Sequence, residues 1–226
     1  MHRPPRIEYP NAHYHVMSRG ARRDAIFRDD DDRACLLAIL AMALQACDAR
    51  VFAYCLMGNH YHLVVHTRRA NLSSLMHRVN SVYSATFNRR HALCGSVFDG
   101  RFKALHVDRD SYLLQACRYV DLNPVRAGLV ESPSQWGWSS YRAHTGRHLV
   151  PRWLATAEMH AILLGRAPEA PAQTAVAERH YADWVEDGRG AQLWKESLRQ
   201  GRFLGDEAFV ERVLREAGGF VTDGSP

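Results

Sequence analysis

The chain has 226 residues, of which 46% are hydrophobic and 23% are charged, the composition of a globular protein long enough to bury a core. It has no run of about 18 apolar residues, and Met1–Pro5 lacks the apolar core of a secretory signal, so we expect a cytoplasmic protein without a membrane span. The five cysteines are scattered and form no C-x-x-C pair, which argues against a disulfide framework or a zinc ribbon and predicts reduced core residues.

The net charge of +5 is unevenly distributed. Residues 1–148 contain 20 Lys and Arg against 12 Asp and Glu, whereas residues 149–226 contain 9 against 12. The first part is therefore the predicted surface for a polyanion. Only Lys103 and Lys195 are lysines, so nearly every cation is a guanidinium suited to bidentate phosphate contact. A GC-rich genome would explain the arginine excess equally well, but not its position.

Residues 13–18 are predicted to form the first strand. Its two histidines, His13 and His15, are separated by one residue, and for them we favour packing or solvent exposure. Arg22 and Arg23 follow in a loop, where a phosphate contact and plain solvation are equally easy.

The acidic run Asp29–Asp32 precedes a helix predicted over residues 33–46, where leucines recur at helical spacing. Carboxylates at the start of a helix cap its free N–H groups and meet its positive end. We therefore interpret this run as a helix cap and not as a metal site.

A β-hairpin is predicted from residues 50–66, with strands at 50–57 and 60–66 joined by the turn Gly58-Asn59. The first strand is apolar on both faces, as expected of a central strand. Side chains alternate along a strand, so His60 and His62 lie on one face of the second strand. Two such imidazoles make half of a divalent metal site, although exposed histidine pairs also occur without a metal.

A long helix is predicted over residues 71–90, with Arg78, Arg89 and Arg90 off its buried stripe and free to face a nucleic acid. The stripe is predicted to contain Leu72, Leu75, Met76, Val79, Val82, Tyr83 and Phe87. Alternation from Arg101 onward predicts another strand with Arg101 and Lys103 on one face. The order strand, helix, strand, strand, helix, strand predicts an α+β fold with a ferredoxin-like antiparallel sheet.

A helix capped by Asp108 or Asp110 is predicted to run to about Asp121, and Tyr119 lies on it. The tract 123–128 ends it, and Asn123 can cap a short new helix with Pro124 at its first position. The aromatic cluster of Trp136, Trp138 and Tyr141 is interpreted as a plug on the sheet edge in preference to a base-stacking surface.

Residues 1–148 are predicted to form one domain, and residues 149–226 a small helical extension. Within the extension, residues 165–172 have the composition of a linker. Helices are predicted at 180–185, at 194–199 and, after an Asp206 cap, at 207–216.

Taken in order, several tracts resemble the REP-associated tyrosine transposases, single-strand DNA transposase relatives in the HUH superfamily. The tracts are residues 59–62, 88–91, 98–103 and 118–128, followed by the aromatic segment 136–141. The resemblance covers about residues 5–145 and, more weakly, residues 203–210.

The resemblance implies a metal-dependent enzyme that nicks and transfers single-stranded or hairpin DNA. It implies that Tyr119 is the nucleophile, that His60 and His62 hold Mg²⁺ or Mn²⁺, and that the product is a 5′-phosphotyrosine link with a free 3′-hydroxyl. Asn123, one helical turn after the tyrosine, is the implied third ligand, with His66 as its rival on the face of the two histidines. The predicted DNA-backbone contacts are Arg22, Arg23, Arg68, Arg101 and Lys103.

Two other functions are also compatible with these residues. One is a non-catalytic module that binds DNA hairpins, and the other is a metal-dependent phosphodiesterase or RNase without a covalent step. The oligomeric state, monomer or homodimer, also stays open, as does the question of which subunit's histidines Tyr119 serves.

Overall fold

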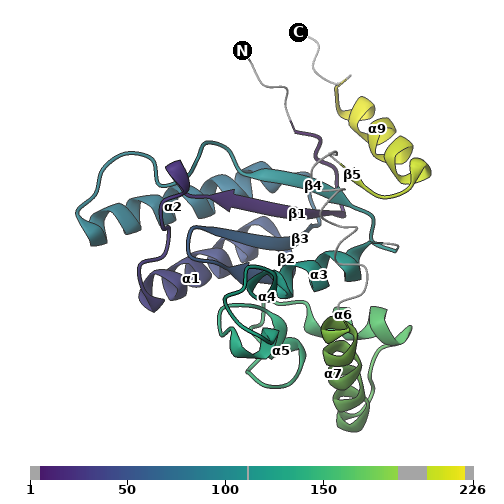
Figure 1. Cartoon of the computed structure of the whole chain (residues 1–226). Helices are drawn as coiled ribbons and strands as arrows, with labels where there is room; N and C mark the ends of the chain where they lie inside the picture. The colour runs from purple at the N-terminus through teal and green to yellow at the C-terminus, as the bar shows by residue number, and fades with distance from the viewer. Residues whose placement is uncertain (1–5, 111, 188–202, 222–226) are drawn as a thin grey trace.

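A computed structural model describes residues 6–110, 112–187 and 203–221 and contains a five-stranded sheet in the order β2-β3-β1-β4-β5 (Figure 1). The first four strands are antiparallel neighbours, which confirms the predicted α+β fold with a ferredoxin-like sheet. The strands are β1 (Ala12–Arg19), β2 (Ala49–Leu56), β3 (His60–Thr67), β4 (Lys103–Val107) and β5 (Phe203–Leu204).

Helices cover both faces of the sheet (Figure 1). On one face lie α1 (Asp30–Cys47) and α2 (Leu72–His91), whose apolar side chains pack on strand residues such as Val16 and Leu63. On the other lies α3 (Leu113–Asp121), which packs against Phe52 and Val64. Alternate residues along a strand thus belong to two separate cores, except in β2, where a register shift between Val51 and Ala53 places the consecutive residues Phe52 and Ala53 in the same core.

The acidic run caps α1, as predicted: Asp29 is its N-cap and accepts a hydrogen bond from the Asp32 backbone N–H. Arg90 at the end of α2 forms ion pairs with Asp29, Asp31 and Asp32, and His91 contacts the buried Asp32 carboxylate at 2.9 Å. The Arg90 guanidinium thus ties the two helices together, and its contact with a nucleic acid stays a prediction.

The first hairpin strand lies at the end of the strand order and not at its centre. It is nonetheless buried, because the aromatic segment covers its outer edge: the Leu56 N–H donates to the Trp138 carbonyl, and Trp136 Nε1 donates to the Leu56 carbonyl. Tyr141 is fully buried. The interpretation of this cluster as a plug on the sheet edge fits these contacts.

Neither end of α3 follows the predicted capping. Its N-cap is Tyr112, without a side-chain cap bond, so neither Asp108 nor Asp110 caps it. Asn123 does not cap α4 (Asn123–Arg126); its amide instead donates to the Tyr119 carbonyl at 2.9 Å, and thereby satisfies the end of α3.

The C-terminal segment packs against the rest of the chain. It contains α6 (Thr156–Leu164), which was not predicted, α7 (Pro171–Glu186), and α9 (Glu207–Val221), whose Phe209 N–H is capped by Asp206. The helix predicted at 194–199 lies outside the described residues. Short helical turns η1 (Ala21–Arg23), η2 (Pro133–Gln135) and α5 (Tyr141–His144) complete the described elements, and the boundary at 148/149 stays a prediction.

Two side chains depart from the predicted core. Val82 on α2 is 46% exposed, so the buried stripe of that helix is narrower than its apolar residues indicate. Cys94 is exposed, whereas Cys47, Cys55 and Cys117 are buried, and all five cysteines are free. Among the helices of the described ranges, none has the length and apolarity to cross a membrane.

Candidate active site

Strand register gathers a histidine cluster on the sheet face that α3 covers. In the β1–β3 pairing, Met17 lies opposite His62 and Arg19 opposite His60. Side chains at paired positions share a face, so His15, two residues before Met17, points to that face as well. The His15 and His62 rings stack with centroids 5.1 Å apart, and the His60 and His62 centroids are also 5.1 Å apart.

Each predicted metal-binding histidine is held through one ring nitrogen. His60 Nδ1 lies 2.7 Å from Asn59 Oδ1, and His62 Nδ1 lies 3.0 Å from His15 Nε2. Such bonds fix the orientation of an imidazole and leave Nε2 for a ligand. His15 is buried, so the predicted alternative of solvent exposure is wrong for this residue. The alternative of packing is correct but incomplete, because His15 also contacts the His62 ring nitrogen.

The three imidazoles are neutral at pH 7. Burial lowers the pKa of His60 to about 4, with a further contribution from the charge of Arg19. Burial likewise lowers the pKa of His15 to about 4 and that of His62 well below its ordinary value. A neutral imidazole is the form that binds a metal ion.

Tyr119 of α3 lies against this cluster. Its ring centroid is 5.7 Å from that of His15 and 6.0 Å from that of His62, both in edge-on contact. The helix is placed by α3 side chains that pack on β2 and β3, including Cys117 and Val120, both fully buried. The structure thus brings together the tyrosine and histidines that the sequence separates by more than fifty residues.

Two arginines near Tyr119 were not predicted as site residues. The Arg126 guanidinium carbon lies 4.4 Å from the centroid of the Tyr119 ring. Burial raises the pKa of Tyr119, while the charge of Arg126, a hydrogen bond from it, and the charge of Arg19 act in the opposite direction. Arg126 lies about two helical turns after Tyr119, so its spacing in the tract 118–128 was the sequence signal that could have identified it as a site residue.

The two rivals for a third ligand lie in different places. Asn123 is fixed beside Tyr119 by its bond to the Tyr119 carbonyl. His66 is four residues beyond His62 on the same strand, about 13 Å away along it. Its ring stacks on His13 at 4.4 Å, so it belongs to a different end of the sheet.

The donor set fits a divalent ion only in part. His60 and His62 offer neutral, oriented imidazoles, which is what a metal ligand requires. Across residues 6–110, 112–187 and 203–221, however, no group of three or more His, Cys, Asp or Glu side chains is arranged to hold a metal. Further ligands would have to be oxygens from an amide, water or substrate, and such ligands suit Mg²⁺ and Mn²⁺.

Three of the predicted DNA-contact residues lie at the histidine end of the sheet. Arg22 and Arg23 are exposed in η1, which packs on the hairpin turn: Asn59 Nδ2 donates to the Arg23 carbonyl at 2.9 Å. Lys103 of β4 is exposed and lies opposite Met17 of β1, which in turn lies opposite His62 of β3, so Lys103 is two strands from His62 on the same face of the sheet.

The other two lie elsewhere. Arg68 follows β3 at the opposite end of the sheet and forms a half-exposed ion pair with Asp48 at 3.4 Å. Arg101 precedes β4 and lines a pocket beside α2, on the face away from Tyr119. The prediction that Arg101 and Lys103 share a strand face is therefore wrong, because the strand begins only at Lys103.

The family model described as "Transposase IS200 like" matches residues 8–123. A solved structure of a REP-associated tyrosine transposase bound to a REP hairpin is 17% identical, covering 69% of this chain and 92% of its own, with a TM-score of 0.55. A candidate transposase from Deinococcus radiodurans R1 is 14% identical, covering 49% and 89%, with a TM-score of 0.38. No curated protein matches the chain.

Proposed function

Because the chain belongs to the family of IS200-like transposases, we propose that it nicks and rejoins single-stranded or hairpin DNA through a covalent link between Tyr119 and a 5′ phosphate. The observation that carries this proposal is the contact of the Tyr119 ring with His62 and His15. A phenol beside oriented, neutral imidazoles is the constellation that nucleophilic attack on a phosphodiester needs.

The proposed step is a transesterification. The Tyr119 phenol oxygen attacks phosphorus, a Tyr–O–P bond forms, and the P–O3′ bond breaks. The phenol loses its proton to water, and the departing 3′ oxygen gains one, so atoms and charge balance without an external energy source. Since one ester replaces another, a 3′-hydroxyl can reverse the step, which suits strand transfer better than hydrolysis.

Tyr119 needs assistance because burial raises the pKa of a phenol that is already weakly acidic. The positive charges of Arg126 and Arg19 lower the pKa of Tyr119 and so favour loss of its proton. In the proposal, His60 and His62 hold Mg²⁺ or Mn²⁺ together with the Asn123 amide oxygen. A bound divalent ion would supply neutralisation of the charge that develops on the phosphate oxygens.

A DNA hairpin is the proposed partner. It is supported by the solved relative, which is bound to a REP hairpin and shares the fold of this chain. Arg22, Arg23 and Lys103, exposed at the histidine end of the sheet, would contact the DNA backbone. Such contacts position a strand without reading its sequence.

The test incubates end-labelled hairpin DNA carrying single-stranded flanks with the full chain and Mn²⁺, followed by a denaturing gel. We expect a covalent protein–DNA adduct that EDTA prevents. Tyr119→Phe should reduce the adduct by roughly three orders of magnitude or more, because only the attacking oxygen is removed. Tyr112→Phe, at the start of the same helix, is the matched control and should still form the adduct.

Two results would point to the rival functions. Hairpin binding without nicking under any divalent ion would identify a binding module. Cleavage that leaves no adduct and survives Tyr119→Phe would identify a phosphodiesterase that acts without a covalent step.

A further inference from the structure

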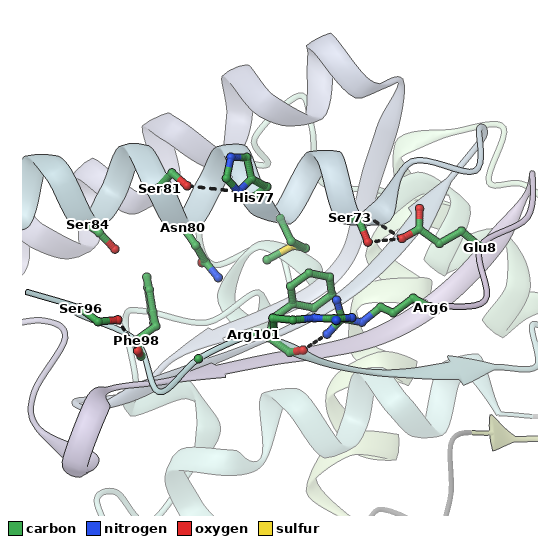
Figure 2. Close-up of a pocket in the computed structure, with 13 residues that line it drawn as sticks. Arg6, Glu8, Ser73, His77, Asn80, Ser81, Ser84, Ser96, Phe98 and Arg101 are labelled. Atoms are coloured by element: carbon green, nitrogen blue, oxygen red, sulfur yellow. Dashed lines mark hydrogen bonds between the residues drawn. The ribbon is translucent and has the colours of Figure 1, made fainter. Parts of the chain in front are cut away.

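A pocket with a largely apolar floor and several charged and polar side chains lies beside α2 (Figure 2), on the sheet face opposite Tyr119. It runs between α2 and the segment 96–102 that leads into β4, and the N-terminal residues Arg6 and Glu8 close one end. Its volume is about 850 Å³, within the range of about 300 to 1,000 Å³ that small-molecule sites occupy. The active site described above uses none of its lining residues.

Two guanidiniums converge in this pocket. Arg6 lies over the Phe102 ring, 3.5 Å from its centroid, and donates a hydrogen bond to the Phe102 carbonyl. Burial lowers the pKa of Arg6, and the neighbouring positive charge of Arg101 lowers it further. Arg101 is exposed and has no carboxylate partner among the described residues. The two positive charges of Arg6 and Arg101 repel each other, so an anion bound between them would stabilise both.

The one carboxylate in the pocket is already engaged. Glu8 Oε1 accepts hydrogen bonds from the Ser73 backbone N–H at 2.9 Å and from the Ser73 hydroxyl. Figure 2 shows Glu8 and Ser73 together at one end, away from Ser84 and Ser96. Two guanidiniums, those of Arg6 and Arg101, thus face a single carboxylate, whose charge acts on Arg6, and the charged side chains that line the pocket carry a net positive charge.

The opposite wall is a row of small polar side chains on α2. His77, Ser81 and Ser84 follow one another at intervals of three or four residues and line the pocket, and Figure 2 shows Ser81 and His77 paired with each other. Asn80 between them is held rigidly, because its Oδ1 accepts from the Tyr61 hydroxyl and its Nδ2 donates to Ser18. The Ser84 hydroxyl is thus placed to hydrogen-bond a ligand. The Ser81 hydroxyl lies 3.4 Å from His77 Nδ1 and keeps a lone pair with which it can accept a further hydrogen bond.

We propose that this pocket binds one unpaired nucleotide of a single-stranded DNA segment, with its phosphate between Arg6 and Arg101 and its base or sugar against the α2 row. The inference deepens the proposed function and rests on it for the class of partner. The combination favours a nucleotide because guanidiniums pair with phosphate, whereas the hydroxyl row suits the polar edges of a base or sugar. The DNA then contacts both faces of the sheet, and this pocket anchors a strand that Tyr119 does not cut.

The test measures equilibrium binding of a fluorescent single-stranded oligonucleotide to the full chain by anisotropy, with EDTA present so that no cleavage intervenes. Arg101→Gln should weaken binding by about 3- to 10-fold and reduce the dependence of log affinity on log salt by about 0.7, the loss of one phosphate contact. Arg152→Gln removes the same charge at an exposed position outside the pocket and serves as its control.

A second pair of variants tests the polar wall without changing charge. Ser81→Leu fills the pocket, whereas Ser74→Leu places the same leucine on an exposed position of α2 that does not line it. We expect weaker oligonucleotide binding for Ser81→Leu alone, with the salt dependence of the wild type. Leucine favours helices, so both variants should fold.

The outcomes separate this inference from the proposed function. If the wild type forms the covalent adduct but the pocket variants bind DNA as their controls do, the pocket proposal alone is overturned. If the pocket variants bind DNA more weakly than their controls but the wild type never forms an adduct, the pocket proposal stands and the proposed function fails. Absence of any DNA binding, or tighter binding of an acidic peptide than of DNA, overturns the pocket proposal.

Discussion

At the scale of single residues, the most perturbed carboxyl group lies at the end of the tyrosine helix. Asp121 is completely buried, and burial raises its pKa to about 7 although Ser140 and Tyr181 donate hydrogen bonds to it. The folded protein thus holds this proton more tightly than the unfolded chain, where the pKa is about 3.8.

This difference predicts a pH dependence of stability. Because the folded-state pKa is raised, the free energy of unfolding should fall as the pH rises from about 4 to about 7 and then level off. Asp121→Asn removes this titrating group. Between about pH 5 and pH 8, the free energy of unfolding should therefore fall by roughly 2 to 3 kcal/mol more in the wild type than in the variant. Urea unfolding at the two pH values measures the difference.

The control for this prediction is Asp99→Asn, at an exposed carboxylate, which should keep the wild-type pH dependence. Parallel pH profiles for the wild type and Asp121→Asn would show that Asp121 stays ionised in the folded protein.

Residue spacing predicted part of the candidate site and missed the rest for a physical reason. The predicted hairpin indicated His60 and His62 as a pair on one face, and the predicted helix contained Tyr119. The resemblance to the transposase family implied their roles. The position of His15 against His62 depends on the register between β1 and β3, which joins residues almost fifty positions apart. Nothing local to His15 distinguishes it from His13, whose ring stacks on His66 instead.

At the scale of elements, the turn after β1 shows how the loop with Arg22 and Arg23 is held. The Gly20 N–H donates to the Asn59 carbonyl, and the Arg23 and Asp24 N–H groups close the turn on Gly20 and Ala21. A Cβ at Gly20 would lie 2.1 Å from the Asp24 carbonyl oxygen. Only glycine permits this close approach.

Gly20→Ala should therefore destabilise the protein by about 1 to 3 kcal/mol, since backbone must move to relieve the clash. Gly58→Ala, in the hairpin turn that this loop contacts, meets no atom within 4 Å and is the matched control. Thermal unfolding of both variants measures the effect; equal melting temperatures would show that the turn adapts without cost.

The regular elements of the sheet were predictable because period-two and helical patterns are local. The predicted strands at 13–18, 50–57 and 60–66 differ from the observed ones by no more than one residue at either end. The sequence does not show which distant element packs against each face of a helix or strand. Arg90 carries no local sign that it will meet the acidic cap of α1, sixty residues earlier.

At the scale of the whole molecule, the C-terminal segment shares its core with the helix that bears Tyr119. Met159, Tyr181 and Val185 are fully buried in the cluster that contains α3. Arg118 donates to the Trp184 carbonyl at 3.0 Å and lies over the Trp184 ring. The segment therefore braces the tyrosine helix from the side away from the sheet.

A chain ending at residue 148 should accordingly lose its cooperative thermal transition or melt at a lower temperature, because the apolar side of α3 becomes exposed. Differential scanning calorimetry of the truncated and full chains measures this. A truncated chain with the transition of the full chain would instead show that residues 1–148 fold independently, as their sequence predicts.

The parallel pairing of β5 with His106 and Val107 has a consequence for biosynthesis. About a hundred residues separate the two strands, so a ribosome working at about 5–20 residues per second leaves the outer border of β4 open for roughly 5 to 20 seconds. During that interval β4 is an unpaired edge strand on which a strand of another chain could pair. The exposed, charged side chain of Lys103 on β4 disfavours such intermolecular pairing.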